Sequence, residues 1–337
     1  MKAQIKHISY HLPKTIFSNE DYFKLFPDTI SNKENLLKIG TESRHIIQTN
    51  QTASDIAVEA AKALFIEHDV DPKDIDFLLF CAQEFDYYTP TSACIIHERL
   101  NLPEQCGALD FNLGCSGYVY GLSLAKGLIE GVGLKNVLLL TSSTLTKTFH
   151  EKDKSSRFLF GDGASATLIT ASETSNGIGE FIFGTDGKGA NKIIIKDGGA
   201  RNKITENSYK EIKDDYGNIT TDACFYMNGI SIFIFGLNIV PKLVNDILQK
   251  EQKTISDIDL FIFHQANLFL IDKIANKLQI PSEKVFNFMK NTGNTVSSSI
   301  PIALSEAIKS GNAKKGDTIL LAGFGVGLSW AATIIKL

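Results

Sequence analysis

The chain has few cysteines and lacks the patterns that would tie them together. Its five cysteines are odd in number, and no two of them form a Cys-x-x-Cys pair. A disulfide framework and a structural zinc site are therefore not predicted, and no metal is expected. This cysteine usage fits a reducing, cytoplasmic compartment, in which a free thiol can carry out chemistry.

The chain also lacks a dense basic block, a targeting segment and a long hydrophobic run. With 34 Lys and Arg against 38 Asp and Glu, its formal net charge is −4, which argues against nucleic acid as a partner. Residues 1–7 contain no apolar run of the signal-peptide kind, so secretion is not predicted. The most apolar stretch, residues 230–240, contains Gly and Asn and is shorter than a bilayer span, so no membrane association is predicted.

Strand-like runs alternate with helical patterns along the chain, which indicates an α/β architecture. The second half of the sequence repeats the first in the same order. The matching segments are 74–83 with 257–266, 99–103 with 277–281, 114–115 with 293–294, and 137–140 with 318–321. This repetition predicts two copies of one α/β unit around a pseudo-twofold axis, with residues 1–174 as the N-terminal half and 175–337 as the C-terminal half.

Two apolar runs predict buried strands. Residues 77–80 and 260–263 lack the alternation of a half-exposed strand, so each is expected between helix layers. Residues 184–222 are rich in Gly, Lys, Asn and Asp with weak periodicity. They predict an irregular excursion near the mouth of a pocket.

Cys115 is the first candidate for chemistry. It lies between a strand-like run, residues 107–113, and a helix-like run, residues 118–130. A cysteine on such a turn faces the unpaired N–H groups of a helix N-terminus, which predicts a lowered thiol pKa and a nucleophilic thiolate. Taken alone, the residue fits a small buried hydrophobic side chain equally well.

The repeat brings two further candidates to the same axis. His264 directly follows residues 260–263 and is expected at the carboxyl end of the sheet, where α/β proteins bind ligands. Asn294 stands in the second copy where Cys115 stands in the first, each after a glycine. Alone, His264 fits a packing residue, and the segment around Asn294 fits a turn with a helix cap.

Together these segments resemble the Cys–His–Asn active site of the ketoacyl-ACP synthase III family in the thiolase superfamily. The matching motifs are Gly-Cys-Ser-Gly around Cys115, His-Gln-Ala-Asn from His264, Gly-Asn-Thr-x-Ser-Ser-Ser around Asn294, and residues 10–13, 160–164 and 323–325. The resemblance implies a thiolase-like five-layer αβαβα fold with two duplicated halves, a homodimer, and acyl transfer between thioesters without metal or organic cofactor.

The resemblance also implies a reaction in two halves. Cys115 would take the acyl group from an acyl-CoA, with the backbone N–H groups of Cys115 and Gly325 as the oxyanion hole. Malonyl-ACP would then undergo decarboxylative Claisen condensation, with His264 and Asn294 stabilising the enolate and Asn267 orienting the His264 ring. The product would be a 3-oxoacyl-ACP, as in fatty acid biosynthesis.

The chain departs from the family's pattern where substrates bind. Lys38 and Arg44 are retained in kind and are expected to bind substrate, although the tryptophan expected just upstream is absent. Phe269 stands where the family carries an arginine that receives acyl carrier protein, so the docking face is expected to be atypical. Val326 replaces a glycine and is expected to alter the acyl channel. Thr89 is expected to line the acyl pocket or the dimer seam.

Glu84 leaves the function open. It falls against Asn267 in the repeat, and it resembles the general base of hydroxymethylglutaryl-CoA synthases and head-to-head condensing enzymes. A carboxylate at the pocket rim or the dimer contact is the other interpretation. The alternatives to a synthase III-type enzyme are therefore a specialised-pathway acyltransferase, a non-decarboxylative condensing enzyme with Glu84 as base, and an inactive partner subunit. Retention of Cys115, His264 and Asn294 argues against the last of these.

Overall fold

Two β-sheets form the centre of the computed structural model, which describes residues 1–173, 177–215 and 217–337. The first sheet has the strand order β1-β7-β6-β4-β5, and the second has the order β13-β14-β15-β8. The strands of the first sheet are β1 (Lys2–His11), β4 (Phe77–Ala82), β5 (Gly107–Asn112), β6 (Asn136–Ser143) and β7 (Gly163–Ser172). Those of the second are β8 (Ile178–Thr185), β13 (Leu260–Phe263), β14 (Thr318–Gly325) and β15 (Ser329–Lys336).

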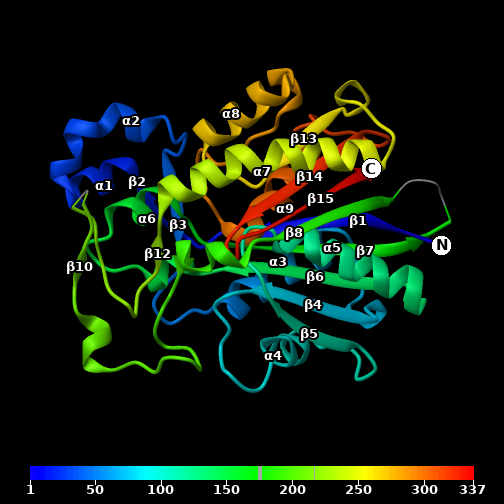
Figure 1. Ribbon diagram of the computed structural model, residues 1–337. Coiled ribbons are helices and arrows are strands. Elements are labelled where there is room, and N and C mark those ends of the chain that lie inside the picture. The colour runs from blue at the N-terminus through cyan, green and yellow to red at the C-terminus, as the bar shows by residue number, and fades with distance from the viewer. Residues whose placement is uncertain (174–176, 216) are drawn as a thin grey trace.

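Helices cover both sheets and fill the space between them (Figure 1). In layer order they are α3 (Ala53–Glu67) and α4 (Ser92–Arg99) on the first sheet, α5 (Gly117–Gly127) and α9 (Ser299–Lys309) between the sheets, and α7 (Gly229–Lys250) and α8 (Leu268–Leu278) on the second. The predicted five-layer αβαβα fold is confirmed. A helix of the central layer touches both sheets, which explains why its residues are apolar on opposite faces.

The two apolar runs form the buried strands that their sequence predicted. Leu78 and Ile262 are fully buried, and burial of each such side chain contributes roughly 1.5–3 kcal/mol. Strand β4 pairs in parallel with β5 and β6, and β13 pairs in parallel with β14. Since parallel strands end at the same edge of a sheet, the residues that follow β4, β5 and β13 collect at one side of the layers.

The two sheets draw on separate parts of the chain. The first sheet ends with Ser172, and the second begins with Ile178. The predicted boundary between residues 174 and 175 falls on 174–176, outside the described residues. The division into two halves at that position therefore stays a prediction.

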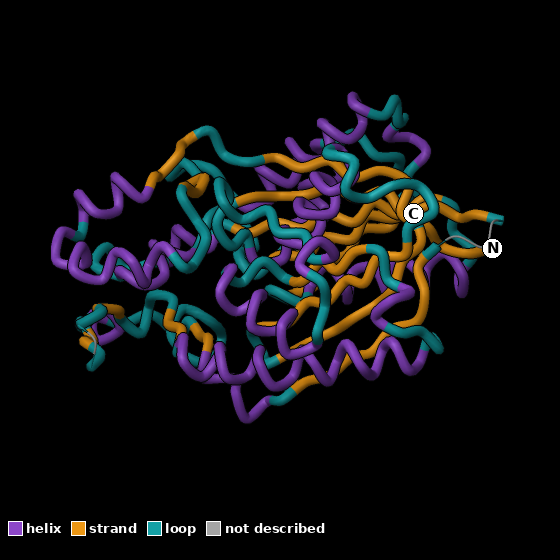
Figure 2. Tube along the Cα trace, turned by 90° about the horizontal axis from the view of Figure 1, so that it is seen from above, coloured by secondary structure: helices purple, strands orange, loops and turns teal. Residues whose placement is uncertain are grey.

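Short elements gather at one end of the layers, at the left of Figure 1 and in the projecting arms of Figure 2. They are β2 (Thr15–Ser18), α1 (Asn19–Leu25), α2 (Lys33–Leu37), β3 (Ser43–Ile46), α6 (Lys154–Leu159), β9 (Ile193–Ile194), β10 (Ile212–Lys213), β11 (Ile219–Thr220) and β12 (Tyr226–Met227). The predicted excursion over 184–222 is thus not wholly irregular. Its residues 193–195 and 197–199 line a cavity, as a segment near a pocket mouth should.

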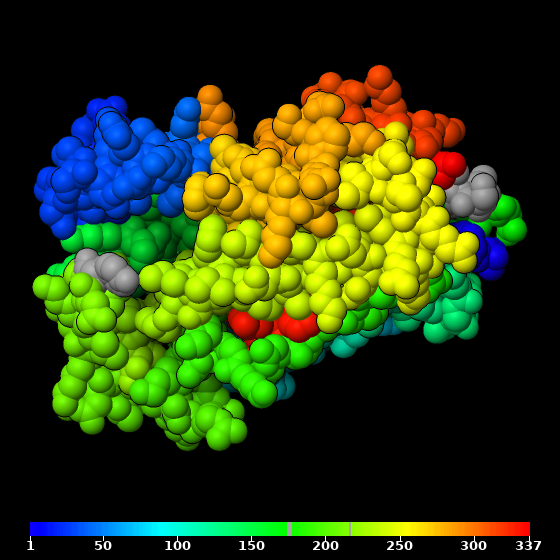
Figure 3. All heavy atoms as spheres, turned by 45° about the horizontal axis from the view of Figure 1, so that its top comes forward, coloured from blue at the N-terminus to red at the C-terminus, as the bar shows by residue number. Residues whose placement is uncertain are grey.

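Helix α7 is longer than the apolar stretch that the sequence analysis considered. It continues through Pro241 to 22 residues, so by length and composition alone it could cross a membrane, and the expectation that it is too short is wrong. One side of the helix is packed on the second sheet through Val240, Leu243, Val244 and Ile247, which are buried. Its other side lies on the surface next to α8 (Figure 3).

Candidate active site

Cys115, His264 and Asn294 line one cavity of about 130 Å³. Cys115 lies two residues before α5, on the turn that follows β5. His264 follows β13 directly, and Asn294 precedes the turn into α9. The structure therefore brings together the three residues that the repeat placed on one axis, and all three are almost fully buried.

The side-chain amide of Asn294 is fixed by its backbone neighbours. Its Oδ1 accepts a hydrogen bond from the N–H of Val296 at 2.9 Å, and its Nδ2 faces the carbonyl oxygen of Ala266 at 3.5 Å. Since a backbone N–H can only donate and a carbonyl can only accept, this assignment of the amide is unambiguous. The group that faces His264 Nε2, at 3.4 Å, is therefore the NH₂ of Asn294.

This arrangement determines which nitrogen of His264 carries the proton. Nε2 faces a donor and must hold the lone pair, so the proton lies on Nδ1, which is 2.7 Å from the hydroxyl of Ser299. Burial lowers the pKa of His264 to about 3, and a backbone hydrogen bond with Val296 offsets a small part of that shift. The ring is therefore neutral at physiological pH, with a free base at Nε2.

The predicted orienting role of Asn267 is wrong. Its Oδ1 accepts from the N–H of Leu270 at 2.8 Å and caps α8, while Ser299 holds the His264 ring. An Asn directly before a helix satisfies the free N–H groups of the first turn, which accounts for this placement. Asn267 still lines the cavity, next to His264. Ser299 belongs to the Ser-Ser-Ser run after Asn294, but nothing in the sequence singled it out from the other two serines.

The predicted lowering of the Cys115 pKa is also wrong. Burial raises the pKa of the thiol to about 12, and hydrogen bonds from the backbone N–H groups of Val326 and of Cys115 itself offset part of the rise. Only 8% of Cys115 is exposed, so the cost of desolvating a thiolate exceeds what the backbone N–H groups return. The resting sulfur is a thiol, which must lose its proton as it reacts.

Val326 takes the place that the sequence analysis gave to Gly325. The backbone N–H groups beside the sulfur are those of Val326 and of Cys115 itself, so Val326 rather than Gly325 is positioned to donate there. Gly325 has a different importance: a Cβ at this position would lie 2.6 Å from Cys115 Cβ and 2.7 Å from its Sγ. The glycine is needed because β14 passes directly beside the thiol.

Lys38 and Arg44 have different environments. The side chain of Lys38 is exposed, and its Nζ donates to Asn35 Oδ1 at 2.9 Å. The segment after it comes close to the cavity, since the carbonyl of Ile39 accepts from the N–H of Leu268, the neighbour of the lining residue Asn267. Arg44 is fully buried, so the prediction that it binds substrate is wrong. Its guanidinium donates to Asn19 Oδ1 and to backbone carbonyls, and burial lowers its pKa to about 10.

Thr89 and Phe269 both lie on the surface. Thr89 donates through Oγ1 to the carbonyl of Tyr88 at 2.8 Å, and it is not among the described residues that line the cavity of Cys115. Phe269 is 42% exposed on α8 and stacks on Phe233, which lines the cavity of Cys115. An aromatic pair therefore stands at this entrance of the site.

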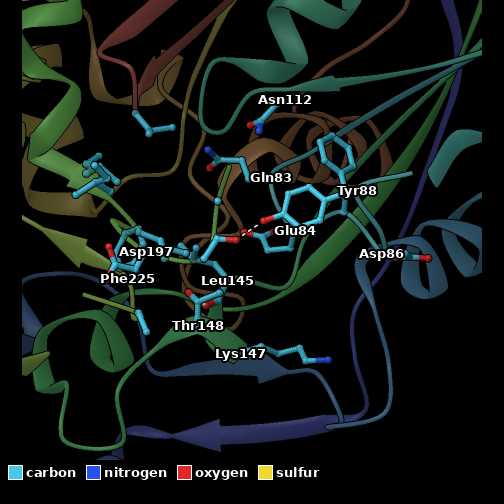
Figure 4. A pocket seen from close by; sticks show the side chains of 18 of the residues that line it. Gln83, Glu84, Asp86, Tyr88, Asn112, Leu145, Lys147, Thr148, Asp197 and Phe225 are labelled. Carbon is cyan, nitrogen blue, oxygen red and sulfur yellow. Dashed lines mark hydrogen bonds between the residues drawn. The ribbon is translucent and has the colours of Figure 1, made fainter. Parts of the chain in front are cut away.

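Glu84 lines a second, larger cavity of about 910 Å³ (Figure 4). Its Oε2 accepts from the N–H of Thr144 at 3.2 Å. Burial raises the pKa of the carboxyl to about 7, Asp162 adds to the rise, and the N–H groups of Thr144 and of Glu84 itself oppose it. His264 and Asn294 line the other cavity, so Glu84 does not share their chamber. Among the described residues, no group of three or more His, Cys, Asp or Glu is placed to hold a metal ion.

A five-layer fold with a buried thiol, a neutral imidazole and an amide at the carboxyl ends of its strands defines a thiolase-like acyltransferase. The family described as 3-oxoacyl-[acyl-carrier-protein (ACP)] synthase III matches residues 109–187, and its C-terminal counterpart matches residues 248–337. The chain is 37% identical to beta-ketoacyl-[acyl-carrier-protein] synthase III of Clostridium perfringens over 335 residues, 99% of each chain.

Solved structures agree with these sequence matches. A 3-oxoacyl-(acyl-carrier-protein) synthase III crystal structure superimposes with a TM-score of 0.97 at 44% identity and full coverage of both chains. The synthase III of Thermus thermophilus gives a TM-score of 0.87 at 28% identity over 99% of each chain. The chain belongs to the 3-oxoacyl-ACP synthase III family, and the family resemblance seen in its motifs is confirmed.

Proposed function

We propose that the chain transfers an acyl group from an acyl-CoA to Cys115 and condenses it with malonyl-ACP, releasing CO₂ and a 3-oxoacyl-ACP. The observation that carries this proposal is the convergence of Cys115, His264 and Asn294 on one cavity, with the N–H of Val326 beside the sulfur. These residues supply a nucleophile, a base, an amide donor and an oxyanion donor.

The first half-reaction is acylation of the thiol. His264 Nε2 accepts the proton of Cys115 as the sulfur attacks the thioester carbonyl, and the oxyanion is met by the N–H groups of Cys115 and Val326. The tetrahedral intermediate collapses to the acyl-cysteine, and the proton passes from Nε2 to the departing CoA thiolate. Each backbone donor of this kind typically lowers the barrier by about 3–4 kcal/mol.

The second half-reaction is decarboxylation and carbon–carbon bond formation. The malonyl thioester carbonyl accepts from Asn294 Nδ2 and from His264 once its Nε2 carries a proton. The Ser299 hydroxyl can donate as well as accept, so the ring can change tautomer without losing its partner at Nδ1. Loss of CO₂ leaves an enolate that attacks the acyl-cysteine, and the released thiolate takes up one proton.

The remaining parts of the proposal concern partners and setting. The exposed Lys38 and the aromatic entrance around Phe269 suit a thioester carried by CoA or by acyl carrier protein, with a docking face less basic than the family's pattern. The enzyme needs no cofactor beyond its thioester substrates. We place it in the cytoplasm as a homodimer, and the exposed Leu109 on the edge strand β5 is consistent with a partner there.

Intact mass spectrometry tests the first half-reaction. Wild type incubated with butyryl-CoA is expected to gain one butyryl group, and Cys115→Ala is expected to gain none. Absence of the wild-type adduct with every acyl-CoA tried would refute the nucleophile assignment.

Addition of malonyl-ACP to the acylated enzyme tests the second half-reaction. One CO₂ is expected per 3-oxoacyl product. A product formed without CO₂ would instead support the non-decarboxylative alternative with Glu84 as base. Asn294→Ala is the matched variant, because it retains both the thiol and the His264 base needed for acylation and is expected to lose CO₂ release.

A further inference from the structure

The large cavity and the cavity of the reacting thiol share a wall residue, Ile193. Val326, whose N–H lies beside the sulfur, lines the large cavity. Leu145 and Ile193 line it as well, and both belong to the apolar cluster that contains Cys115. An acyl group on Cys115 that extends towards the large cavity therefore meets apolar side chains first.

Beyond these apolar residues the wall of the cavity becomes polar (Figure 4). Glu84, Gln83 and Asn112 lie at or just after the ends of β4 and β5 and line it together. The Oε1 of Gln83 lies over Gly114, where a Cβ would be 2.6 Å away from it. Glu84 retains hydrogen-bonding capacity: one oxygen accepts from the N–H of Thr144, and among the described residues no side chain donates to either oxygen. Oδ1 of Asp86 also lacks a partner, but that atom is fully buried and so does not face a ligand.

The charges around this carboxyl disfavour an anion. Asp86 and Asp197 also line the cavity, and Asp162 lies close enough behind the wall to raise the pKa of Glu84. Lys147, the one lysine among the described residues of the lining, donates through its Nζ to two backbone carbonyls outside the cavity. A neutral or positive donor is the complementary ligand.

We propose that Glu84 is a specificity-determining residue, which accepts a hydrogen bond from a hydroxyl or ammonium group carried on the acyl chain of the donor thioester. The inference rests on the proposed function, since it places the acyl group on Cys115. It gives the substrate a defined chemistry: an apolar segment next to the thioester, then a hydrogen-bond donor. Both the ionised and the protonated carboxyl have an oxygen that can accept this bond.

Pairs of acyl-CoAs with the same shape test this proposal. The short set is butyryl-, 3-hydroxypropionyl- and 3-aminopropionyl-CoA, and the long set is heptanoyl-, 6-hydroxyhexanoyl- and 6-aminohexanoyl-CoA. The measurement is kcat/KM for formation of the acyl-enzyme adduct, followed by intact mass. In at least one set the wild type is expected to prefer a donor-bearing acyl group by about 3- to 10-fold, the usual worth of one hydrogen bond.

Variants at Glu84 separate recognition from intrinsic reactivity of the thioesters. Glu84→Leu is expected to abolish the preference while still accepting the alkyl members. Glu84→Gln retains an accepting oxygen, so it is expected to keep the hydroxyl preference and lose any ammonium preference. Asp197→Asn is the matched control: it alters another acid of the same cavity, retains an acceptor for Ser208, and is expected to leave the preference unchanged.

Each result has one interpretation. No preference in either set, or a preference that persists in Glu84→Leu, would overturn the specificity role. Loss of condensation with every acyl group in Glu84→Gln would instead assign Glu84 as the base. Failure of all six thioesters to acylate wild type would be a failure of the proposed function, not of this inference. If Glu84→Leu does not fold, the wild-type preference and the Glu84→Gln comparison still decide the question.

Discussion

Replacing Ser299 by alanine tests how the His264 ring is held. The hydroxyl lies 2.7 Å from His264 Nδ1 and 3.3 Å from the N–H of Gln265, and both side chains are buried. Ser299→Ala therefore leaves a buried ring N–H without its partner, which costs about 1–3 kcal/mol. Part of this cost appears as lost stability, and part as a ring free to adopt the wrong tautomer or orientation. We expect acylation by butyryl-CoA to slow by about 10-fold, which corresponds to about 1.4 kcal/mol.

Ser298→Ala is the matched control for this prediction. Ser298 is the preceding residue and is equally buried, but its hydroxyl faces Gly163 and Thr141 rather than His264. It should cost similar stability in chemical denaturation and leave the rate of adduct formation within about 2-fold, since only a hydroxyl on the ring affects the base. Equal acylation rates for Ser299→Ala and Ser298→Ala would refute the assignment of Ser299 as a positioning residue.

Three further predictions concern the backbone beside the thiol and two buried ionisable side chains. Gly325→Ala should abolish the acyl-enzyme adduct, because the new Cβ would lie 2.7 Å from Cys115 Sγ. In the control Gly127→Ala the new Cβ meets open space, so this variant should still form the adduct and should gain up to about 1 kcal/mol in free energy of unfolding. An unchanged adduct in Gly325→Ala would contradict the geometry. Arg44→Leu should lower the free energy of unfolding by about 1–3 kcal/mol, because it leaves buried acceptors without their donor; denaturation measures this loss, which a substrate-binding role would not produce. Glu84 has a folded pKa of about 7 against 4.5 unfolded, so the unfolded state binds fewer protons between these values and stability falls as pH rises from 4.5 to 7, by up to about 3 kcal/mol. Glu84→Gln should reduce this fall and leave the part that Asp162 contributes below about pH 6, since burial raises the pKa of Asp162 to about 6. An undiminished fall between denaturation curves at pH 5 and pH 8 would disprove a contribution from Glu84.

The sequence predicted the structure correctly where a run of apolar residues is unbroken or where a segment is repeated in the second half of the chain. The unbroken apolar runs predicted β4 and β13 because a strand buried on both faces needs no polar alternation. The internal repeat predicted that Cys115, His264 and Asn294 converge, since equivalent turns of a duplicated unit meet at its axis. Both inferences depend only on which residues follow one another along the chain, and the sequence gives this information completely.

The sequence was uninformative where tertiary packing chooses between near-equivalent groups. Ser299 and Asn267 are both plausible partners for His264, and only the path of the chain into α9 decides between them. Likewise, Gly325 and Val326 are adjacent and each has a backbone N–H, but only the structure shows that the N–H of Val326 is the one directed at the sulfur. Arg44 looked like a ligand for an anion because charge is visible in a sequence and burial is not.

The thiol pKa illustrates a more general property of the site. Cys115, with a pKa of about 12, and His264, with a pKa of about 3, are both uncharged at neutral pH. A buried thiolate–imidazolium pair would have to be stabilised against desolvation before any substrate arrives. The neutral thiol and imidazole avoid this cost, and an incoming thioester does not have to separate a thiolate from a neighbouring imidazolium. In the proposed mechanism charge develops only as the carbonyl is attacked, next to the N–H groups of Cys115 and Val326, so their stabilisation acts more on the transition state than on the uncharged resting thiol.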